Sequence, residues 1–223
     1  MHSIVAQLRQ ELSFVSDPEK ASQMAAYMKG QFRFFGVQSK QRKDISNRIW
    51  KDNKIVIIAE FKQICIEAWQ CDEREVQYTA MDWLGKLESS LELDDLAFIE
   101  SLIKYKSWWD TVDFLASHGV GQILKSDQEV RRNTCERYLE SGNMWLHRTA
   151  LIFQLMYKEN TDEELLLNMI VRSLGSSEFF INKAIGWSLR QYSKIYPEAV
   201  RQFVDKHSPD MAGLSIREAS KYL

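Results

Sequence analysis

Apolar residues recur along the chain at spacings of three and four, which is the period of amphipathic α-helices. No window alternates apolar and polar residues in the way that predicts a strand. Asp17 before Pro18 is a typical helix start, and this helix is predicted to end near Gly30. Ser39 can cap the next helix, which runs through Trp50. Further helices are predicted over Val56–Trp69, Glu73–Ser89, Asp94–Tyr105, Trp108–Leu124, Gln128–Glu140, Met144–Lys158, Asp162–Leu174, Glu178–Ile195, Glu198–Lys206 and Asp210–Tyr222.

Three of these helices share a short pattern. Tyr78–Met81 resembles Arg148–Leu151 and, more weakly, Asn182–Ile185. The intervals fit a unit of about 35 residues with two helices, which places Asp113 at the first position of the same pattern. In such a solenoid each helix pair packs against its neighbours, and equivalent positions line up along one wall. The sequence therefore predicts an all-α solenoid in which Asp113 is a neighbour of Arg148.

Composition agrees with a helical, intracellular protein. Three prolines and nine glycines are few for 223 residues and favour long helices. Cys65, Cys71 and Cys135 are odd in number and lack Cys-x-x-Cys spacing, so neither a disulfide framework nor a zinc site is expected. The start of the chain does not look like a secretory signal, and no apolar run approaches a membrane span. We expect a single cytoplasmic domain over residues 1–223, although the length also permits two domains.

The charges are distributed in blocks, although the net charge is only −2. Residues 29–54 hold eight Lys/Arg against two acids, and residues 55–103 hold eleven acids against three basic residues. After Ile181 the balance is basic again, with seven Lys/Arg against four acids. The blocks are compatible with one positive face that binds an anionic polymer. They are equally compatible with ordinary solvated helix faces.

The segment Ser107–Asp113 holds two indoles and two carboxylates. Trp109 and Asp113 are four residues apart and share a helical face, whereas Trp108 belongs to a separate apolar stripe with Val112 and Leu115. If that stripe is buried, the indole and the carboxylate point outward together, which suits a cationic or electron-poor ligand. The alternative is that both tryptophans are core residues and both aspartates are solvated.

Two further segments carry basic and aromatic residues. Arg148 can bind a phosphate in a bidentate manner, and a salt bridge at the rim is the alternative. Lys183, Trp187 and Arg190 share a helical face, and this stripe fits a sugar-phosphate backbone. The alternative is a buried indole flanked by cations that extend to solvent. Gly186 would let a ligand or another helix approach closely.

Taken together and in order, several segments resemble the HEAT-like-repeat alkylpurine DNA glycosylases, the AlkD-like DNA alkylation repair enzymes. The matching segments are Tyr27–Lys29, Phe34–Gln38, Lys106–Asp113, Trp145–Ala150, Phe153–Leu155, Glu178–Ile181 and Lys183–Trp187. The resemblance implies a curved, right-handed α-solenoid of about 12–13 helices, whose concave basic groove holds duplex DNA. It also implies a monomer that hydrolyses the N-glycosidic bond of cationic lesions such as 3-methyladenine and 7-methylguanine.

The resemblance also assigns roles to residues. It implies that Trp109, Asp113 and Trp187 surround the deoxyribose of the lesion as the catalytic residues, that Arg148 holds backbone phosphate, and that Tyr27 corresponds to the family's tyrosine near the amino terminus. The remaining residues expected to contact DNA are basic or aromatic: Lys29, Lys183, Arg190, Phe179 and Phe180.

The chemistry of these residues agrees with the resemblance. A cationic purine leaves as a neutral base, so positive charge gathers on the sugar. The Asp113 carboxylate can stabilise that charge and position water, and indole faces attract the same centre. The four histidines are scattered and no nucleotide-binding motif occurs, so neither a metal nor a cofactor is expected. The alternative function is a non-catalytic helical-repeat protein that binds branched or damaged DNA or another protein.

Overall fold

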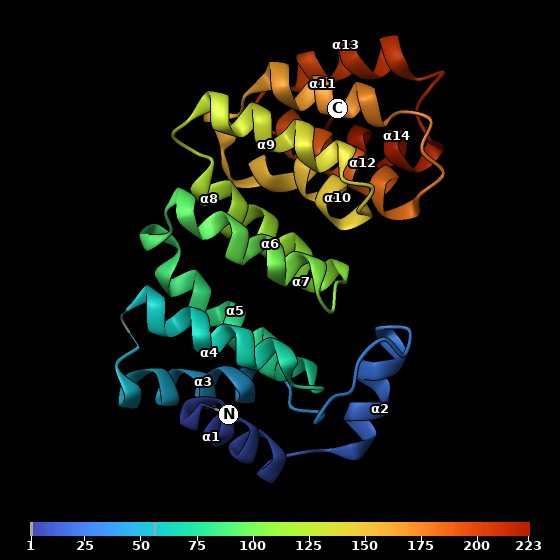
Figure 1. Cartoon of the computed structure of the whole chain (residues 1–223). Coiled ribbons are helices and arrows are strands. Elements are labelled where there is room, and N and C mark those ends of the chain that lie inside the picture. Colours follow the sequence, from blue (N-terminus) through green and yellow to red (C-terminus); the bar gives the residue numbers. More distant parts are fainter. Residues whose placement is uncertain (1, 56) are drawn as a thin grey trace. The chain divides into compact units, whose positions relative to one another are not determined.

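The structure is a computed structural model, and it describes residues 2–55 and 57–223. Helices make up its regular secondary structure (Figure 1). Within the described residues no strand forms, and Arg33 and Glu73 share only an isolated parallel β-bridge. The predicted all-α class is therefore confirmed. The chain divides into two compact units, Met1–Leu91 and Glu92–Leu223, and each is described by itself.

The first unit contains one helix that the sequence analysis did not predict. Its elements are α1 (Ser3–Phe14), α2 (Pro18–Tyr27), α3 (Ser39–Asn53), α4 (Ile58–Gln70), α5 (Arg74–Leu87) and the short 3-10 helix η1 (Glu88–Ser90). The unpredicted helix α1 lacks a common N-cap residue; the His2 ring accepts the Ile4 N–H instead. Its apolar face buries Ile4, Val5, Leu8 and Leu12. Val56, the first residue of the helix predicted over Val56–Trp69, lies outside the described residues.

Helix α2 begins as predicted, because Asp17 accepts backbone N–H groups and Pro18 takes the first helical position. None of its residues is buried. The loop that follows is fixed by the fully buried Glu75 of α5, whose carboxylate accepts the N–H groups of residues 35–37 at 2.8–3.1 Å. Gly36 has φ of +87°, and a Cβ there would lie 2.0 Å from the Asp17 carbonyl oxygen. The loop therefore requires glycine at this position.

The second unit carries most of the predicted site residues. Its main helices are α6 (Leu96–Lys104), α7 (Trp109–Phe114), α8 (Gly121–Ile123), α9 (Gln128–Glu140), α10 (Met144–Ile152), α11 (Glu163–Ser173), α12 (Phe179–Ser193), α13 (Pro197–His207) and α14 (Gly213–Ala219). Single turns of 3-10 helix are η2 (Leu93–Asp95), η4 (Phe153–Met156), η5 (Lys158–Asn160) and η6 (Ser220–Tyr222). Helix α12 packs against α10, α13 and α14, and α10 also contacts α7 and α9. This packing brings α7, α10 and α12 together.

The single helix predicted over Trp108–Leu124 is interrupted. Between α7 and α8 the residues Leu115–Val120 form a π-helical segment (η3). Two glycines permit close packing there: a Cβ on Gly119 would lie 2.9 Å from the Ile99 side chain, and one on Gly121 would lie 2.5 Å from the Phe153 carbonyl oxygen. Segments of π-helix often occur next to functional residues, and this one directly follows the helix that holds Asp113.

Side-chain interactions repeat along the second unit at a nearly constant step. Arg137 of α9 pairs with Glu100 of α6 across 37 residues, and Arg148 pairs with Asp113 across 35. The Tyr157 hydroxyl donates to the Gly121 carbonyl across 36 residues. These recurring contacts match the predicted repeat of about 35 residues.

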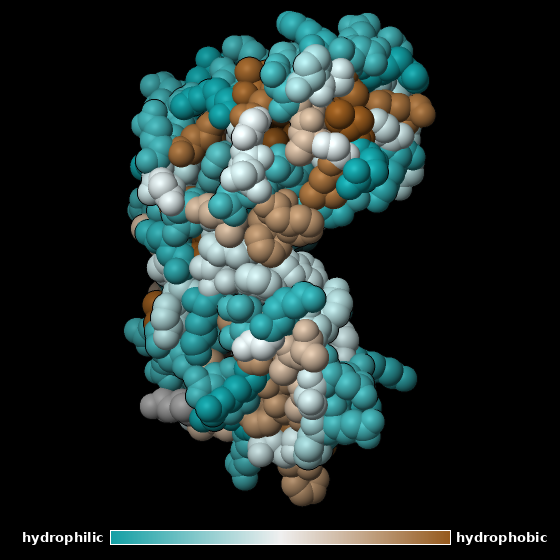
Figure 2. Space-filling view, turned by 90° about the vertical axis from the view of Figure 1, so that its right-hand side faces the viewer, coloured by the Kyte–Doolittle hydropathy of each residue, from teal (hydrophilic) through white to brown (hydrophobic). Residues whose placement is uncertain are grey.

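The surface of the second unit is mixed in polarity. Figure 2 shows hydrophobic residues among hydrophilic ones on this unit, in the upper part of the view. Its exposed large hydrophobic residues include Met156, Val171 and Phe179. Isolated apolar residues are normal on protein surfaces, so a site must be sought from geometry rather than from hydropathy alone. Among the described residues, none of the helices is long and apolar enough to cross a membrane.

Candidate nucleic-acid site in the second unit

A cavity of about 360 Å³ is formed by residues of α7, α10 and α12. It combines four aromatic side chains with one acid and three basic residues. The lining residues are Trp109, Asp113, Arg148, Phe179, Phe180, Lys183, Trp187 and Arg190. Every one of them was singled out from the sequence. Residues up to about 80 positions apart in the chain therefore meet around one space.

Asp113 and Arg148 form a buried bidentate ion pair inside this cavity. The Arg148 Nε and Nη2 atoms donate to the two Asp113 carboxylate oxygens at 2.7 and 2.9 Å. Arg148 Nη1 donates to the Phe180 carbonyl oxygen at 2.6 Å. The arginine side chain is only 3% exposed and the aspartate side chain 15%. The guanidinium is thus engaged within the protein rather than turned toward solvent, and it fixes the direction of the carboxylate.

The local sequence explains how the two partners are positioned. Val112 on α7 and Leu115 at the start of η3 are fully buried, in agreement with the predicted apolar stripe, and this turns Asp113 to the adjacent face. On α10, the Asn143 side chain caps the helix by accepting the N–H groups of residues 145 and 146 at 3.0 and 3.1 Å. Arg148 lies in the second turn after this cap, opposite Asp113.

An aromatic cluster supports the pair from one side. The Trp108 ring lies 5.8 Å from Trp145 and 5.2 Å from Phe180, and Trp145 lies 4.9 Å from Phe180. The Phe179 and Phe180 rings are in edge contact at 5.3 Å. Trp108 thus takes the supporting position, whereas Trp109 lines the cavity. The low polarity of these neighbours strengthens electrostatic interactions at the carboxylate.

Two opposing effects act on the pKa of Asp113. Burial is the larger one and raises this pKa above its usual value, while the hydrogen bonds and the charge of Arg148 lower it. The nearby Asp110 raises it further. The net result is a raised pKa, so the charge of the carboxylate depends on Arg148 as its counterion.

The basic residues of α12 are held by a carboxylate that the sequence analysis did not identify. Glu218 of α14 accepts Lys183 Nζ at 2.7 Å and also pairs with Arg190 and with Lys221. Residues 113, 148, 183 and 218 follow one another at a step of 35 residues, and two ion pairs join them. The constant step of 35 residues is therefore the sequence feature from which Glu218 could have been predicted.

Gly186 allows the approach of a helix, which was one of the two alternatives expected for it. A Cβ at this position would lie 2.5 Å from the Glu218 Cβ and 2.8 Å from the Ser215 carbonyl oxygen. The Ser215 hydroxyl donates to the Asn182 carbonyl at 2.8 Å and joins the two helices further. Close packing of α14 on α12 therefore depends on glycine.

Replacing Gly186 by Ala should therefore destabilise the fold. Both obstacles are near the backbone of α14, so they cannot be relieved by a rotamer change, and overpacking of this kind costs about 1–3 kcal/mol. Chemical denaturation should show a lower midpoint with an unchanged slope. An equally stable variant would contradict the close packing described here. The matched control is Gly213→Ala, where the nearest atom to a Cβ is the end of the Arg217 side chain at 3.5 Å.

Tyr27 and Lys29 lie in the first unit. Tyr27 ends α2 and is 68% exposed, and Lys29 follows with a left-handed φ of 58°. Both residues are accessible, and their assignment to DNA binding stays a prediction.

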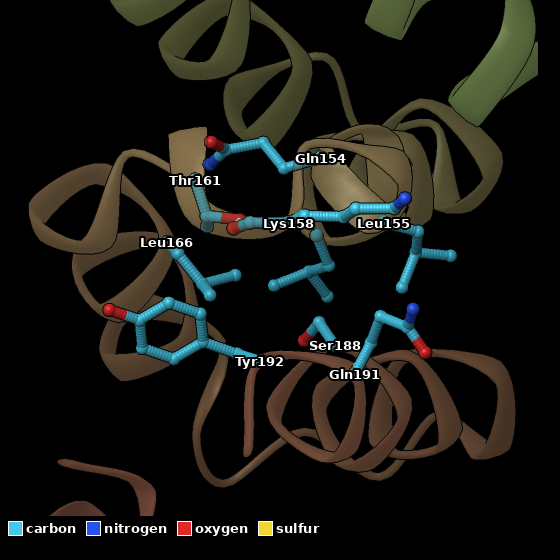
Figure 3. Close-up of a pocket in the computed structure, with 9 residues that line it drawn as sticks. Gln154, Leu155, Lys158, Thr161, Leu166, Ser188, Gln191 and Tyr192 are labelled. Atoms are coloured by element: carbon cyan, nitrogen blue, oxygen red, sulfur yellow. Dashed lines mark hydrogen bonds between the residues drawn. The ribbon is translucent and has the colours of Figure 1, made fainter. Parts of the chain in front are cut away.

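A second, much smaller cavity lies in the same unit. Figure 3 shows it between the segment with Gln154 and Lys158 and the part of α12 with Ser188, Gln191 and Tyr192. Its volume is about 20 Å³, which is room for about one water molecule. A nucleobase or sugar does not fit there. A cavity of about 570 Å³ between α11 and α13 is larger but is lined by none of the predicted site residues, so the cavity at Asp113 is the candidate site.

Comparison with known proteins identifies the family of the chain. The model of the family described as DNA alkylation repair enzyme matches residues 8–223. A solved structure described as a predicted DNA alkylation repair enzyme from Enterococcus faecalis is 34% identical, with a TM-score of 0.85 over 93% of this chain and 96% of that chain. No curated protein matches the chain.

Two further solved structures come from Streptococcus mutans. AlkD2 is 19% identical, with a TM-score of 0.60 over 91% of this chain and 99% of that chain. The protein smu.31 of strain UA159 is 20% identical, with a TM-score of 0.59 over 83% of this chain and 96% of that chain. These two likenesses concern the fold, which is that of AlkD-type helical repeat proteins. The family match over both units and the identity with the Enterococcus structure place this chain in the DNA alkylation repair enzyme family.

Proposed function

We propose that the protein is a monofunctional DNA glycosylase that hydrolyses the N-glycosidic bond of positively charged alkylpurines in duplex DNA. Lesions of this class include 3-methyladenine and 7-methylguanine. The observation that carries the proposal is the single cavity shared by Trp109, Asp113 and Trp187. As in the sequence-based prediction, residues 1–223 act as one domain and as a monomer, and Tyr27 and Lys29 contact the DNA.

Asp113 is the group that stabilises charge on the sugar. When the bond to a cationic purine breaks, the base leaves neutral and the deoxyribose becomes electron-deficient. A fixed carboxylate at that position lowers the energy of the transition state and can orient the attacking water. Arg148 holds both carboxylate oxygens and keeps Asp113 ionised against the effect of burial. The ion pair therefore orients the Asp113 carboxylate before the substrate binds.

Trp109 and Trp187 supply the aromatic walls of the site. Their π-faces attract the positive sugar without a further formal charge, and each such contact contributes about 0.5–2 kcal/mol. Because about 1.4 kcal/mol corresponds to a tenfold change in rate, the two indoles together account for an acceleration of about five- to a thousandfold.

The charges of the cavity favour DNA over a free nucleoside as the substrate. Asp113 and Arg148 compensate each other, so Lys183 and Arg190 leave the lining positively charged. A cationic base alone would be repelled there. Backbone phosphates bound by these two residues remove the repulsion and hold the sugar beside Asp113. The predicted contact of Arg148 with backbone phosphate is not part of this proposal, because its side chain is 3% exposed and its guanidinium is bound by Asp113 and the Phe180 carbonyl. Phe179 and Phe180 line the same cavity.

Release of 7-methylguanine tests the proposal directly. The protein is incubated in excess with methylated duplex DNA, and the freed bases are separated by chromatography. We expect 7-methylguanine and 3-methyladenine in the soluble fraction, with abasic sites left in uncut strands. Strand cleavage without added base would contradict a monofunctional enzyme. Absence of released base from a folded protein at micromolar concentration would contradict glycosylase activity.

One observation favours a second function, a helical-repeat protein that binds DNA without catalysis. Both oxygens of Asp113 are already bound by Arg148, as they would be in a purely structural ion pair. A gel-shift comparison separates the two functions. Tighter binding to junction DNA than to a duplex with an alkylated purine, together with no base release, would favour the binding protein.

A further inference from the structure

Glu218 has no place in the function proposed above, because it does not line the cavity. It nevertheless contacts both basic residues of α12 that do, Lys183 and Arg190. We propose that Glu218 is a positioning residue that holds Lys183 and Arg190 as a prearranged pair for the phosphates of DNA. The inference rests on the proposed function to the extent that DNA lies at this cavity.

The arrangement around Glu218 is a carboxylate enclosed by three cations. Its side chain is 8% exposed, and its oxygens accept Lys183 at 2.7 Å and Lys221 at 2.9 and 3.0 Å in addition to Arg190. These contacts lower its pKa to about 2, so it is an anion at any pH used for an assay. The group as a whole keeps a positive charge and can still bind an anion.

Helix α14 is built to bring this carboxylate to α12. Glu218 can come this close only because Gly186 has no side chain. The hydrogen bond from the Ser215 hydroxyl to the Asn182 carbonyl fixes the position of α14 along α12. The carboxylate is therefore part of a rigid contact between helices and not a mobile surface group.

The two cations that it holds remain available to a ligand. The Lys183 side chain is 37% exposed and that of Arg190 is 22% exposed. An ammonium has three N–H donors and a guanidinium five, so each has donors beyond those given to Glu218. Without the Glu218 carboxylate, the positive charges of Lys183 and Arg190 would repel each other. Both long side chains would also regain rotamer freedom, which they would lose again on binding DNA. Glu218 removes that cost in advance.

Binding of a fluorescein-labelled, undamaged DNA duplex tests the inference by anisotropy over a range of salt concentrations. For Glu218→Gln we expect affinity to fall about tenfold at physiological salt, with the slope of log affinity against log salt unchanged, because the same cations still reach the phosphates. Glu218→Asp should recover most of the affinity. The matched control is Glu100→Gln, since Glu100 is an equally buried carboxylate that binds Arg137 and Tyr138 away from the cavity; it should bind DNA like the wild type.

Two results would overturn the inference. Equal or tighter DNA binding by Glu218→Gln would mean that the carboxylate competes with phosphate, and an equal loss in Glu100→Gln would mean a general effect on the fold. Thermal unfolding of each variant accompanies these measurements. If Glu218→Gln does not fold, Lys183→Ala and Arg190→Ala test phosphate binding by the pair. Each substitution should reduce the slope of log affinity against log salt by about one, the amount expected for one lost phosphate contact. An unchanged slope in both would contradict phosphate binding by this pair.

A coupling measurement connects the residues. In a protein that carries both Lys183→Ala and Arg190→Ala, adding Glu218→Gln should leave DNA affinity unchanged, because Glu218 acts only through them. A further loss of affinity would overturn its role as a positioning residue. None of these measurements needs base release, so a wild-type protein that binds DNA but releases no base would end the proposed glycosylase function and not this inference.

Discussion

Replacing Asp113 by Asn should reduce the release of 7-methylguanine by about 10²–10³-fold or more. The substitution keeps the size of the side chain but removes the charge that opposes the positive sugar in the transition state, and the loss of one such preorganised group has this magnitude in other enzymes. The measurement is the single-turnover rate with enzyme in excess, so that changes in DNA affinity do not enter. DNA binding should stay close to that of the wild type.

The same substitution has a structural consequence that must be separated from catalysis. The Arg148 side chain, 3% exposed, would lose the anion that it pairs with. An asparagine amide oxygen accepts only part of its hydrogen bonds and supplies no charge, so we expect a stability loss of about 3–5 kcal/mol, as when a buried ion pair loses one partner. The matched control is Asp110→Asn on the same helix, which should retain base release. A rate for Asp113→Asn within a few-fold of the wild type would contradict the catalytic role.

The sequence was sufficient to group the site residues because the repeat is regular. Once Asp113 and Arg148 are assigned to one register, their proximity follows from the stacking of helix pairs. The residue assigned to this register on α12 was Asn182, one position before Lys183. Glu218 belongs to the same register but was not recognised, since no aromatic or glycine motif surrounds it. The pairing of Arg148 with Asp113 could be anticipated as proximity. The closed form of the ion pair also depends on Phe180 of α12, whose carbonyl oxygen accepts Arg148 Nη1 and whose ring packs on Trp108 and Trp145.

Local signals and tertiary packing account for the remaining differences. The cap at Asp17 is a local signal, and the helix after it begins as predicted. Helix α1 is held mainly by burial of its apolar face and has only a weak cap. The sequence therefore contains no clear start signal for this helix. The π-helical segment at Leu115–Val120 depends on close contacts of Gly119 and Gly121 with residues that are distant in the sequence. A local sequence pattern therefore could not predict it.

Replacing Arg148 by Met should move the acid limb of the rate–pH profile to higher pH. Burial already raises the pKa of Asp113, and Arg148 is the main influence that lowers it. Without the arginine, the carboxylate becomes protonated at a higher pH, and base release requires the ionised form. Activity is therefore lost at a higher pH than in the wild type as the pH falls, and the single-turnover rate over a pH series measures this shift.

In Arg148→Met, a lower pH should reduce the loss of stability that the substitution causes, although it also reduces the rate of base release. Leaving one charge of a buried pair uncompensated costs about 3–5 kcal/mol. Because the pKa of Asp113 is higher in the folded than in the unfolded chain, this destabilisation is fully present above the raised pKa and decreases as the pH falls through it. The double variant Asp113→Asn/Arg148→Met should regain much of the stability at neutral pH without regaining base release. If Arg148→Met shows an unchanged acid limb, then Arg148 does not maintain the charge of Asp113.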